Sequence, residues 1–235
     1  MSDEASCRPF GPRGVRGQVL LSWVLFACLS GLLVSPVGMP GQLRIGYLMI
    51  LLPAGFLVLA ERPHRKCRHG RSAVALFLLG LAGLAVVLTY NIGQPWVDHH
   101  GFNGAVWAIF SRVIARHGFG ATQGLFYWTG GPTLNVRAAV YDHHPPGLPW
   151  MLAVGFATFG VHEWVARSIP IVFTLAAIAS MGAVVGRQHG RRAVGTLLLV
   201  VAACPAVTYF GRMVNFEPIV LSLTILVYSS LLVIK

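Results

Sequence analysis

Carboxylates are scarce in this chain, and two of them stand at the ends of apolar segments. Only 7 of the 235 residues are acidic. Asp98 follows one apolar run, in Trp-Val-Asp-His-His, and Glu217 stands between two others, in Asn-Phe-Glu-Pro. An ionised carboxylate in or beside a bilayer is costly, so its presence there needs a reason. If both acids face the same side of a membrane, they line one site at the lipid–water boundary.

Four basic side chains elsewhere in the sequence could hold a phosphate. His143 and His144 lie in the turn Tyr-Asp-His-His-Pro-Pro-Gly, where two prolines fix the backbone, and Arg167 and Arg212 flank later apolar runs. Transfer of a sugar from a lipid phosphate needs a base for the acceptor hydroxyl and cations for the departing phosphate. Asp98 is the candidate base, and His144, Arg167 and Arg212 are candidate phosphate contacts. An inverting displacement needs only one base, whereas the sequence offers no clear second nucleophile for a retaining one.

Structural roles compete with these assignments. Asp98 could cap a helix that begins near Gly101. Glu163 stands four residues before Arg167, a spacing that favours a structural pair on one helical face over a catalytic Glu163.

A metal site is a second, weaker hypothesis. Asp-His-His occurs at 98–100 and again at 142–144, and such ligands suit zinc or iron. Adjacent histidines rarely bind one ion together, so we assign no residue to a metal. The four cysteines show no paired spacing, which gives no support to a disulfide framework or a zinc knuckle.

Composition places the chain in a membrane. It is 55% hydrophobic and 11% charged, with a mean hydropathy of +0.68, which excludes an ordinary soluble domain. A transmembrane helix needs about 20 apolar residues. We predict an all-α polytopic membrane protein with about six transmembrane helices and a long external loop with interfacial helices. The predicted spans are 18–38, 43–60, 73–92, 166–186, 194–210 and 218–234.

Charge predicts the orientation of these spans. The basic runs at 61–71 and 187–192 should be cytoplasmic by the positive-inside rule. The net charge of +11 gathers in such short loops and not on one amphipathic face, so we expect no nucleic-acid partner. Residues 93–165 then form an external loop, which places Asp98 and Glu217 on the same outer face.

Two segments of this external loop should be helical. Apolar residues recur at helical spacing from Phe102 to Ile114, which predicts an amphipathic helix in the interface. The apolar segment Pro149–Gly160 is about 12 residues long, too short for a span and typical of a re-entrant or interfacial helix.

The order of these features resembles the N-terminal part of the GT-C glycosyltransferases that use polyprenyl-phosphate sugars. That family includes the protein O-mannosyltransferases and the aminoarabinose transferases of lipid A. The similarity covers about residues 73–234: the first-loop acid at Asp98, the Pro-Pro turn, Gly-x-x-Glu-Trp-x-x-Arg at 160–167, and the second-loop acid at Glu217. The family commonly has Asp-Glu where this chain has Asp98-His99, Lys at the position of His144, and Asp at that of Glu217.

The resemblance implies a hexosyl- or pentosyltransferase of a bacterial cell envelope. The donor would be a polyprenyl-phosphate sugar in the membrane, the acceptor an envelope glycan, lipid or protein, and the active site would face outward. Asp98 and Glu217 would be catalytic, with His143, His144, Arg167 and Arg212 at the substrate. Some relatives use a divalent cation, so that requirement stays open.

The expected organisation is a leader and transmembrane hairpin at 1–72 and the start of a catalytic module at 73–235. Since the family's enzymes are usually longer, we expect the chain to be a fragment. A membrane transporter is the remaining alternative, because broken helices with intramembrane charges also suit transport.

Overall fold

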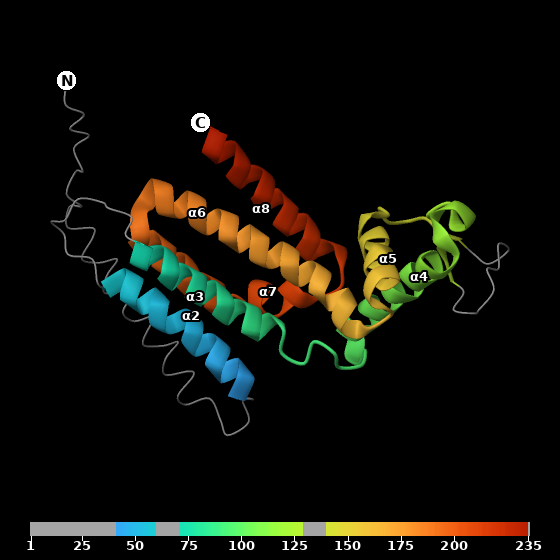
Figure 1. The fold of residues 1–235 in the computed structure, drawn as a ribbon, viewed down its shortest axis with the longest axis horizontal. Coiled ribbons are helices and arrows are strands. Elements are labelled where there is room, and N and C mark those ends of the chain that lie inside the picture. Colours follow the sequence, from blue (N-terminus) through green and yellow to red (C-terminus); the bar gives the residue numbers. More distant parts are fainter. Residues whose placement is uncertain (1–40, 60–70, 129–139, 235) are drawn as a thin grey trace.

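The computed structural model describes residues 41–59, 71–128 and 140–234, and they are almost wholly helical. The predicted all-α class is therefore confirmed (Figure 1). The predicted span 18–38 and the basic run at 61–70 lie outside the described residues. The elements are α2 (Gly41–Leu59), α3 (Arg71–Leu88), α4 (Asp98–Thr122), β1 (Phe126–Tyr127), β2 (Val140–Tyr141), α5 (Gly147–Phe159), α6 (Glu163–Ala203), α7 (Pro205–Thr208), the 3-10 helix η1 (Phe210–Arg212) and α8 (Phe216–Ile234).

A helical bundle forms one half of the molecule. Helices α2 and α3 run side by side as a hairpin, and α6 packs on both of them and on α8 (Figure 1). Its core holds fully buried aliphatic side chains from three of these helices, including Ile50, Leu84 and Leu198. Gly83 lets α2 and α3 approach closely, because a Cβ there would lie 2.7 Å from the carbonyl oxygen of Gly46.

Helix α6 consists of two arms that meet at Gly190. Gly190 has φ 78° and ψ −177°, a backbone conformation that is essentially restricted to glycine. The predicted spans 166–186 and 194–210 fall on these two arms, so the basic run at 187–192 forms a tight junction and not an extended loop. The second arm ends at Ala203, earlier than predicted, and α7 begins at Pro205, whose missing N–H cannot continue the helix ladder.

By length and composition, α2 and α6 could cross a membrane. The segment Ala206–Arg212 and α8 would form a third span if they are counted together, although they are bent by 118°. Helices α3 and α5 are apolar but shorter. The described residues therefore supply two or three such helices by these criteria.

A smaller lobe packs on one end of the bundle. Helix α4 packs against α5, and the strands β1 and β2 pair antiparallel beside α4 (Figure 1). The predicted helix from Phe102 to Ile114 is confirmed within α4, but its apolar face is covered by protein: Phe110 and Ile114 are fully buried. Phe102 is an exception, since it is 61% exposed. The short segment Pro149–Gly160 forms α5, which has 13 residues, fewer than a span needs.

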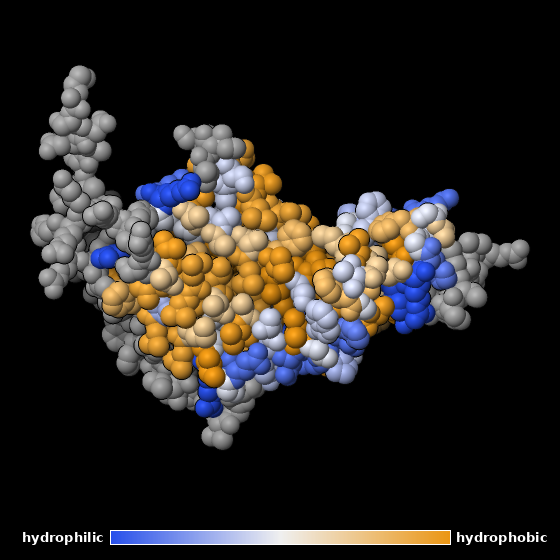
Figure 2. All heavy atoms as spheres, in the orientation of Figure 1, coloured by the Kyte–Doolittle hydropathy of each residue, from blue (hydrophilic) through white to orange (hydrophobic). Residues whose placement is uncertain are grey.

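The molecule has an apolar exterior along the bundle and distinct ends. Figure 2 shows apolar side chains over most of the visible face of the bundle. The exposed apolar side chains of the bundle include Leu52 and Phe56 of α2. Such a surface suits contact with lipid chains. The junction between the two arms of α6, the end of α2 and the start of α3 lie at one end of the bundle, and the lobe lies at the other (Figure 1). The starts of α4 and α8 thus share the lobe end.

Candidate functional site

Arg167 ties the start of α6 to the segment that leads into α4. Its side chain is 7% exposed, and its Nη1 donates hydrogen bonds to the carbonyl oxygens of Ile92 (2.7 Å) and Gln94 (2.5 Å). The guanidinium carbon also lies 4.2 Å from the ring centroid of Trp96, a cation–π contact. Hydrogen bonds to carbonyl oxygens offset the free-energy cost of burying a cation. Arg167 was predicted as a substrate contact, and its described contacts are instead within the chain.

Trp96 also packs closely against α4. A Cβ at Gly104 would overlap the Trp96 ring, so only glycine leaves room for it. Asp98 is the first residue of α4, two positions after Trp96. The structure places the backbone of Asp98 at this junction, while the side chains of 98–100 lie outside the described set.

The capping alternative for Asp98 needs correction. The helix begins at Asp98 and not near Gly101, and its N-cap is Val97, which makes no side-chain capping bond. A residue in the first helical turn cannot serve as the N-cap of that helix. A carboxylate there is still favoured by the positive end of the helix dipole.

Arg212 lies in η1, which α6 also holds. The buried hydroxyl of Thr174 donates a 2.8 Å hydrogen bond to the carbonyl oxygen of Gly211. Arg212 is half-buried, and its charge interacts with that of Arg167 and with Tyr90 and Tyr209. Two guanidinium groups therefore contribute positive potential to one region at the lobe end of the bundle.

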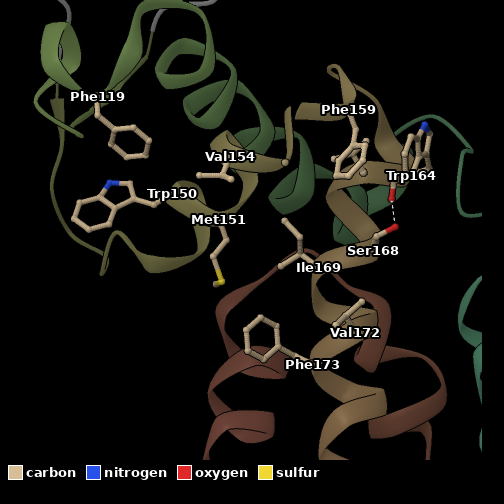
Figure 3. Close-up of a pocket in the computed structure, with 12 residues that line it drawn as sticks. Phe119, Trp150, Met151, Val154, Phe159, Trp164, Ser168, Ile169, Val172 and Phe173 are labelled. Atoms are coloured by element: carbon tan, nitrogen blue, oxygen red, sulfur yellow. Dashed lines mark hydrogen bonds between the residues drawn. The ribbon is translucent and has the colours of Figure 1, made fainter. Parts of the chain in front are cut away.

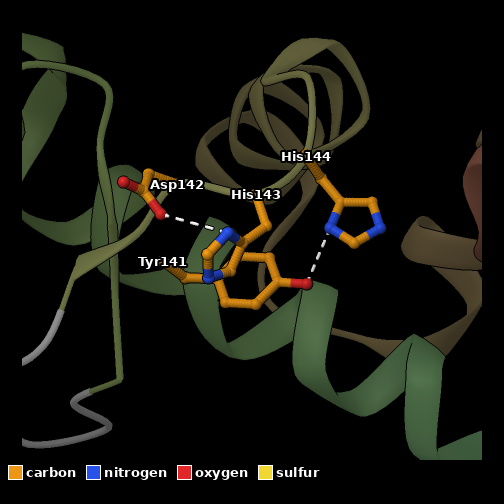
Figure 4. Close-up of polar contacts among 4 residues, drawn as sticks. All are labelled: Tyr141, Asp142, His143 and His144. Atoms are coloured by element: carbon orange, nitrogen blue, oxygen red, sulfur yellow. Dashed lines mark hydrogen bonds and ion pairs between the residues drawn. The ribbon is translucent and has the colours of Figure 1, made fainter.

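The turn that carries the histidines packs against the start of α8. The Tyr141 hydroxyl and His144 Nδ1 form a 2.6 Å hydrogen bond, and the exposed pair Asp142 and His143 lies 3.5 Å apart (Figure 4). The imidazole of His144 stacks on the rings of Tyr141 and Phe216, with centroids 5.4 and 5.3 Å away. Phe216 precedes Glu217, an exposed residue in the first turn of α8. Thus His144 and Glu217 lie on adjoining segments.

Trp107 joins α4 to the same place. Its ring meets His144 edge-on at 5.3 Å and Phe216 at 4.7 Å. Its Nε1 donates to Asn215 Oδ1 (3.3 Å), which also accepts the backbone N–H of Phe216 (3.1 Å). Sequence reasoning missed Trp107 and Asn215, since they are 108 positions apart and no local pattern pairs them.

An apolar groove lies between α5 and the first arm of α6, with a volume of about 640 Å³ (Figure 3). Its polar groups are already engaged: Trp150 Nε1 donates to the Gly124 carbonyl oxygen and Ser168 Oγ to that of Trp164. The groove therefore offers contacts for hydrocarbon only. It is lined by Phe119, Trp150, Met151, Val154, Gly155, Phe159, Trp164, Val165, Ser168, Ile169, Val172 and Phe173.

The sequence motif Gly-x-x-Glu-Trp-x-x-Arg has a structural explanation in this geometry. Gly160 ends α5 with φ 87°, which favours glycine, and its N–H bonds to the Phe156 carbonyl oxygen. Glu163 begins α6, Trp164 lines the groove and Arg167 holds residues 92–94. The motif thus forms the corner between α5 and α6.

The metal hypothesis gains no support from the described side chains. Within residues 41–59, 71–128 and 140–234, no group of three His, Cys, Asp or Glu side chains could hold an ion. The first Asp-His-His copy is not tested by this finding, because its side chains are outside the described set.

The comparison with protein families bears on the second part of the chain. The model of the dolichyl-phosphate-mannose-protein mannosyltransferase family matches residues 143–235. This part of the chain is similar to that family. The match confirms the resemblance to GT-C glycosyltransferases there and indicates a membrane glycosyltransferase. It includes His144, Arg167, Arg212 and Glu217 but not Asp98. No curated protein and no solved structure matches the chain.

Proposed function

We propose that this chain carries the donor site of an integral-membrane glycosyltransferase. The enzyme moves a hexosyl or pentosyl group from a polyprenyl-phosphate carrier to an envelope glycan, lipid or protein, by a single inverting displacement on the outer face of the cell membrane. The observation that carries the proposal is that Arg167 and Arg212, which come from separate segments, lie close enough for their charges to interact, within a region that matches a lipid-donor mannosyltransferase family.

The positive region suits the phosphate of the donor. Arg167 and Arg212 repel each other, and an anion between or beside them would relieve that repulsion. Arg212 offers a planar guanidinium for phosphate oxygens, and His144 offers an imidazole held by its aromatic neighbours. The side chain of His143 is 78% exposed and would contact only the edge of the bound substrate. As the bond to the sugar breaks, these cations stabilise the departing phosphate.

Asp98 and Glu217 supply the acids of this proposal. Each lies in the first turn of a helix at the lobe end of the bundle. An ionised Asp98 would take the proton from the acceptor hydroxyl as that oxygen attacks the sugar. Glu217 follows Phe216, whose ring stacks on His144. It would contact the bound substrate from α8, while Asp98 acts from α4.

The apolar groove suits the polyprenyl chain. A hydrocarbon chain gains free energy from burying apolar area, and the aromatic and aliphatic lining makes no competing polar demand. Trp164 and Val165 of the lining stand just before Arg167, so a chain in the groove would reach the N-terminal end of α6.

Transfer by the purified full-length protein tests the proposal. The donors are polyprenyl-phosphate monosaccharides, mannose first, presented in liposomes with an envelope extract as acceptor. Loss of a general base costs roughly 10²–10⁴-fold, so Asp98→Asn should lower turnover by that factor while the protein still inserts. Glu163→Gln is the matched control and should keep its turnover per inserted molecule. Transfer by Asp98→Asn at the wild-type rate would exclude Asp98 as the base, and no transfer by wild type from any donor would contradict the proposal.

Filling the groove tests the site of the lipid chain. Val154 is 58% exposed in the groove, so Val154→Trp should be tolerated by the fold and should raise the KM for the lipid donor. Val220 of α8 is equally exposed, at 58%, and lies outside the groove. Val220→Trp is therefore the control and should leave that KM unchanged. Equal KM values for both variants would show that the donor chain binds elsewhere.

A further inference from the structure

We propose that one face of the first arm of α6 positions the two halves of the site relative to each other. Arg167 and Thr174 are its positioning residues: Arg167 holds the segment before Asp98, and Thr174 holds the turn that carries Arg212. The inference deepens the proposed function and rests on it for the catalytic consequence, but its structural content stands by itself.

The spacing of the two residues puts them on the same side of the helix. They are seven positions apart, which is about two helical turns. Both are buried, and Ile171 between them is buried as well. Two polar side chains within an otherwise apolar buried stripe are costly unless each is hydrogen-bonded.

Each polar group on this stripe is bonded to the backbone of a different connecting segment. Arg167 reaches back 75 and 73 residues to the carbonyl oxygens of Ile92 and Gln94. Thr174 reaches forward 37 residues to the carbonyl oxygen of Gly211, one position before Arg212. The connections on both sides of the site are therefore fixed to one rigid helix.

Close packing reinforces both attachments. The Trp96 ring contacts both the Arg167 guanidinium and Gly104, so a shift of the segment would disturb both contacts. At the other attachment, a Cβ on Gly211 would lie 2.9 Å from Thr174 Cγ2. Backbone and helix touch directly there, which leaves little freedom for η1 to move.

This arrangement explains why a cation that could bind phosphate is used on carbonyl groups. A planar guanidinium can donate to two carbonyl oxygens while its face stacks on an aromatic ring, whereas a lysine ammonium has no planar face to stack. Arg167 thus sets the place of Asp98, and its charge adds to that of Arg212 at the donor site. In this proposal Arg167 acts on the chemical step through the position of Asp98, whereas the sequence suggested a direct contact with substrate.

Hydrogen exchange of the full-length protein in nanodiscs tests the structural part. Arg167→Lys should speed exchange of the backbone amides in 92–104 by about tenfold, which is the effect expected when charge-assisted hydrogen bonds are lost. The amides of this segment include those of Ile92 and Gln94, which donate to the carbonyl oxygens of Thr89 and Asn91. Thr174→Val should speed exchange only in 209–216, by about fivefold for one neutral bond. The matched controls are Arg116→Lys, an exposed arginine of α4, and Thr196→Val, whose hydroxyl bonds within its own helix.

Gly104→Ala provides a second variant if Arg167→Lys does not insert. The added methyl group should displace Trp96 and speed exchange in 92–104 as well, while Gly120→Ala, which follows the break in α4 at Gly118, meets open space and should not. Unchanged exchange in 92–104 for both Arg167→Lys and Gly104→Ala would overturn the proposal.

Kinetics separate a positioning residue from a substrate contact. With the liposome assay, Arg167→Lys should lower kcat by about tenfold and leave the donor KM within about twofold, because misplacement of a base slows the chemical step. A raised donor KM with normal exchange would make Arg167 a substrate contact and overturn the proposal. If exchange changes as expected but wild type transfers no sugar, the attachment stands and the proposed function fails.

Discussion

Three aromatic side chains orient the imidazole of His144. Tyr141 and Phe216 stack on its two sides, and Trp107 meets its edge. The sequence indicated His144 as a phosphate contact because of the Pro-Pro turn that follows it. The partners that orient the ring could not be predicted, since Trp107 and Phe216 come from segments far away in the chain.

The Tyr141 hydroxyl allows a prediction at the scale of one atom. Tyr141→Phe keeps the ring stack but removes the 2.6 Å hydrogen bond to His144 Nδ1, so the imidazole loses its fixed orientation. A bond of this kind contributes about 1 kcal/mol, and if that free energy holds the imidazole in its productive orientation, turnover should fall roughly fivefold. Tyr228→Phe on the exposed face of α8 is the control. Equal turnover for the two variants would mean that the hydrogen bond has no part in catalysis.

Helix positions were predicted well where apolar periodicity and segment length determine them. They were predicted poorly where a break in the backbone determines where a helix ends. The predicted span 43–60 is α2, and 218–234 is α8 within two residues. Gly190 lies in the basic run 187–192, which suggested a loop. In the structure the chain instead reverses at this one residue. The attachment of 92–96 to Arg167 likewise depends on tertiary contacts, and the Gly-x-x-Glu-Trp-x-x-Arg spacing alone suggested a site and not a corner.

The reversal at Gly190 gives a prediction at the scale of the element. Gly190→Ala adds a Cβ that meets no atom within 4 Å, so any loss comes from the backbone conformation alone. That conformation costs a non-glycine residue about 1–3 kcal/mol, and the free energy of unfolding should fall by this amount. Gly41→Ala, also in open space but without a positive φ, is the control in a thermal or denaturant unfolding series. A loss no larger than that of Gly41→Ala would contradict the backbone explanation.

The whole molecule has two chemically different ends, and this follows from the positions of charged residues along the chain. The junction at Gly190, with Arg187, Arg191 and Arg192 around it, lies opposite the lobe end where α4 and α8 begin. The distribution of basic residues along the sequence predicted that Asp98 and Glu217 lie on the same face of the membrane. It could not predict that α4 and α5 would pack into a lobe around a second buried core, to which α6 and α8 also contribute.

Cysteine labelling tests this arrangement in the membrane. After replacement of the four native cysteines by alanine, single cysteines at 98 and 217 should both react with an impermeant maleimide on intact cells. A cysteine at Gln188 should react only after permeabilisation, since positive junctions stay in the cytoplasm. Reaction of 98 and 217 from opposite sides would refute the shared outer face.

The central claim, transfer of a sugar from a lipid carrier, is tested most directly by mass spectrometry of polyprenyl-phosphate lipids and envelope glycans. The cells lack the full-length gene and are complemented with wild type or with Asp98→Asn. We predict that a lipid-linked sugar accumulates and one glycan, lipid or protein loses that sugar, and that only the wild-type gene restores it. Unchanged lipids and glycans in the cells that lack the gene would contradict the account.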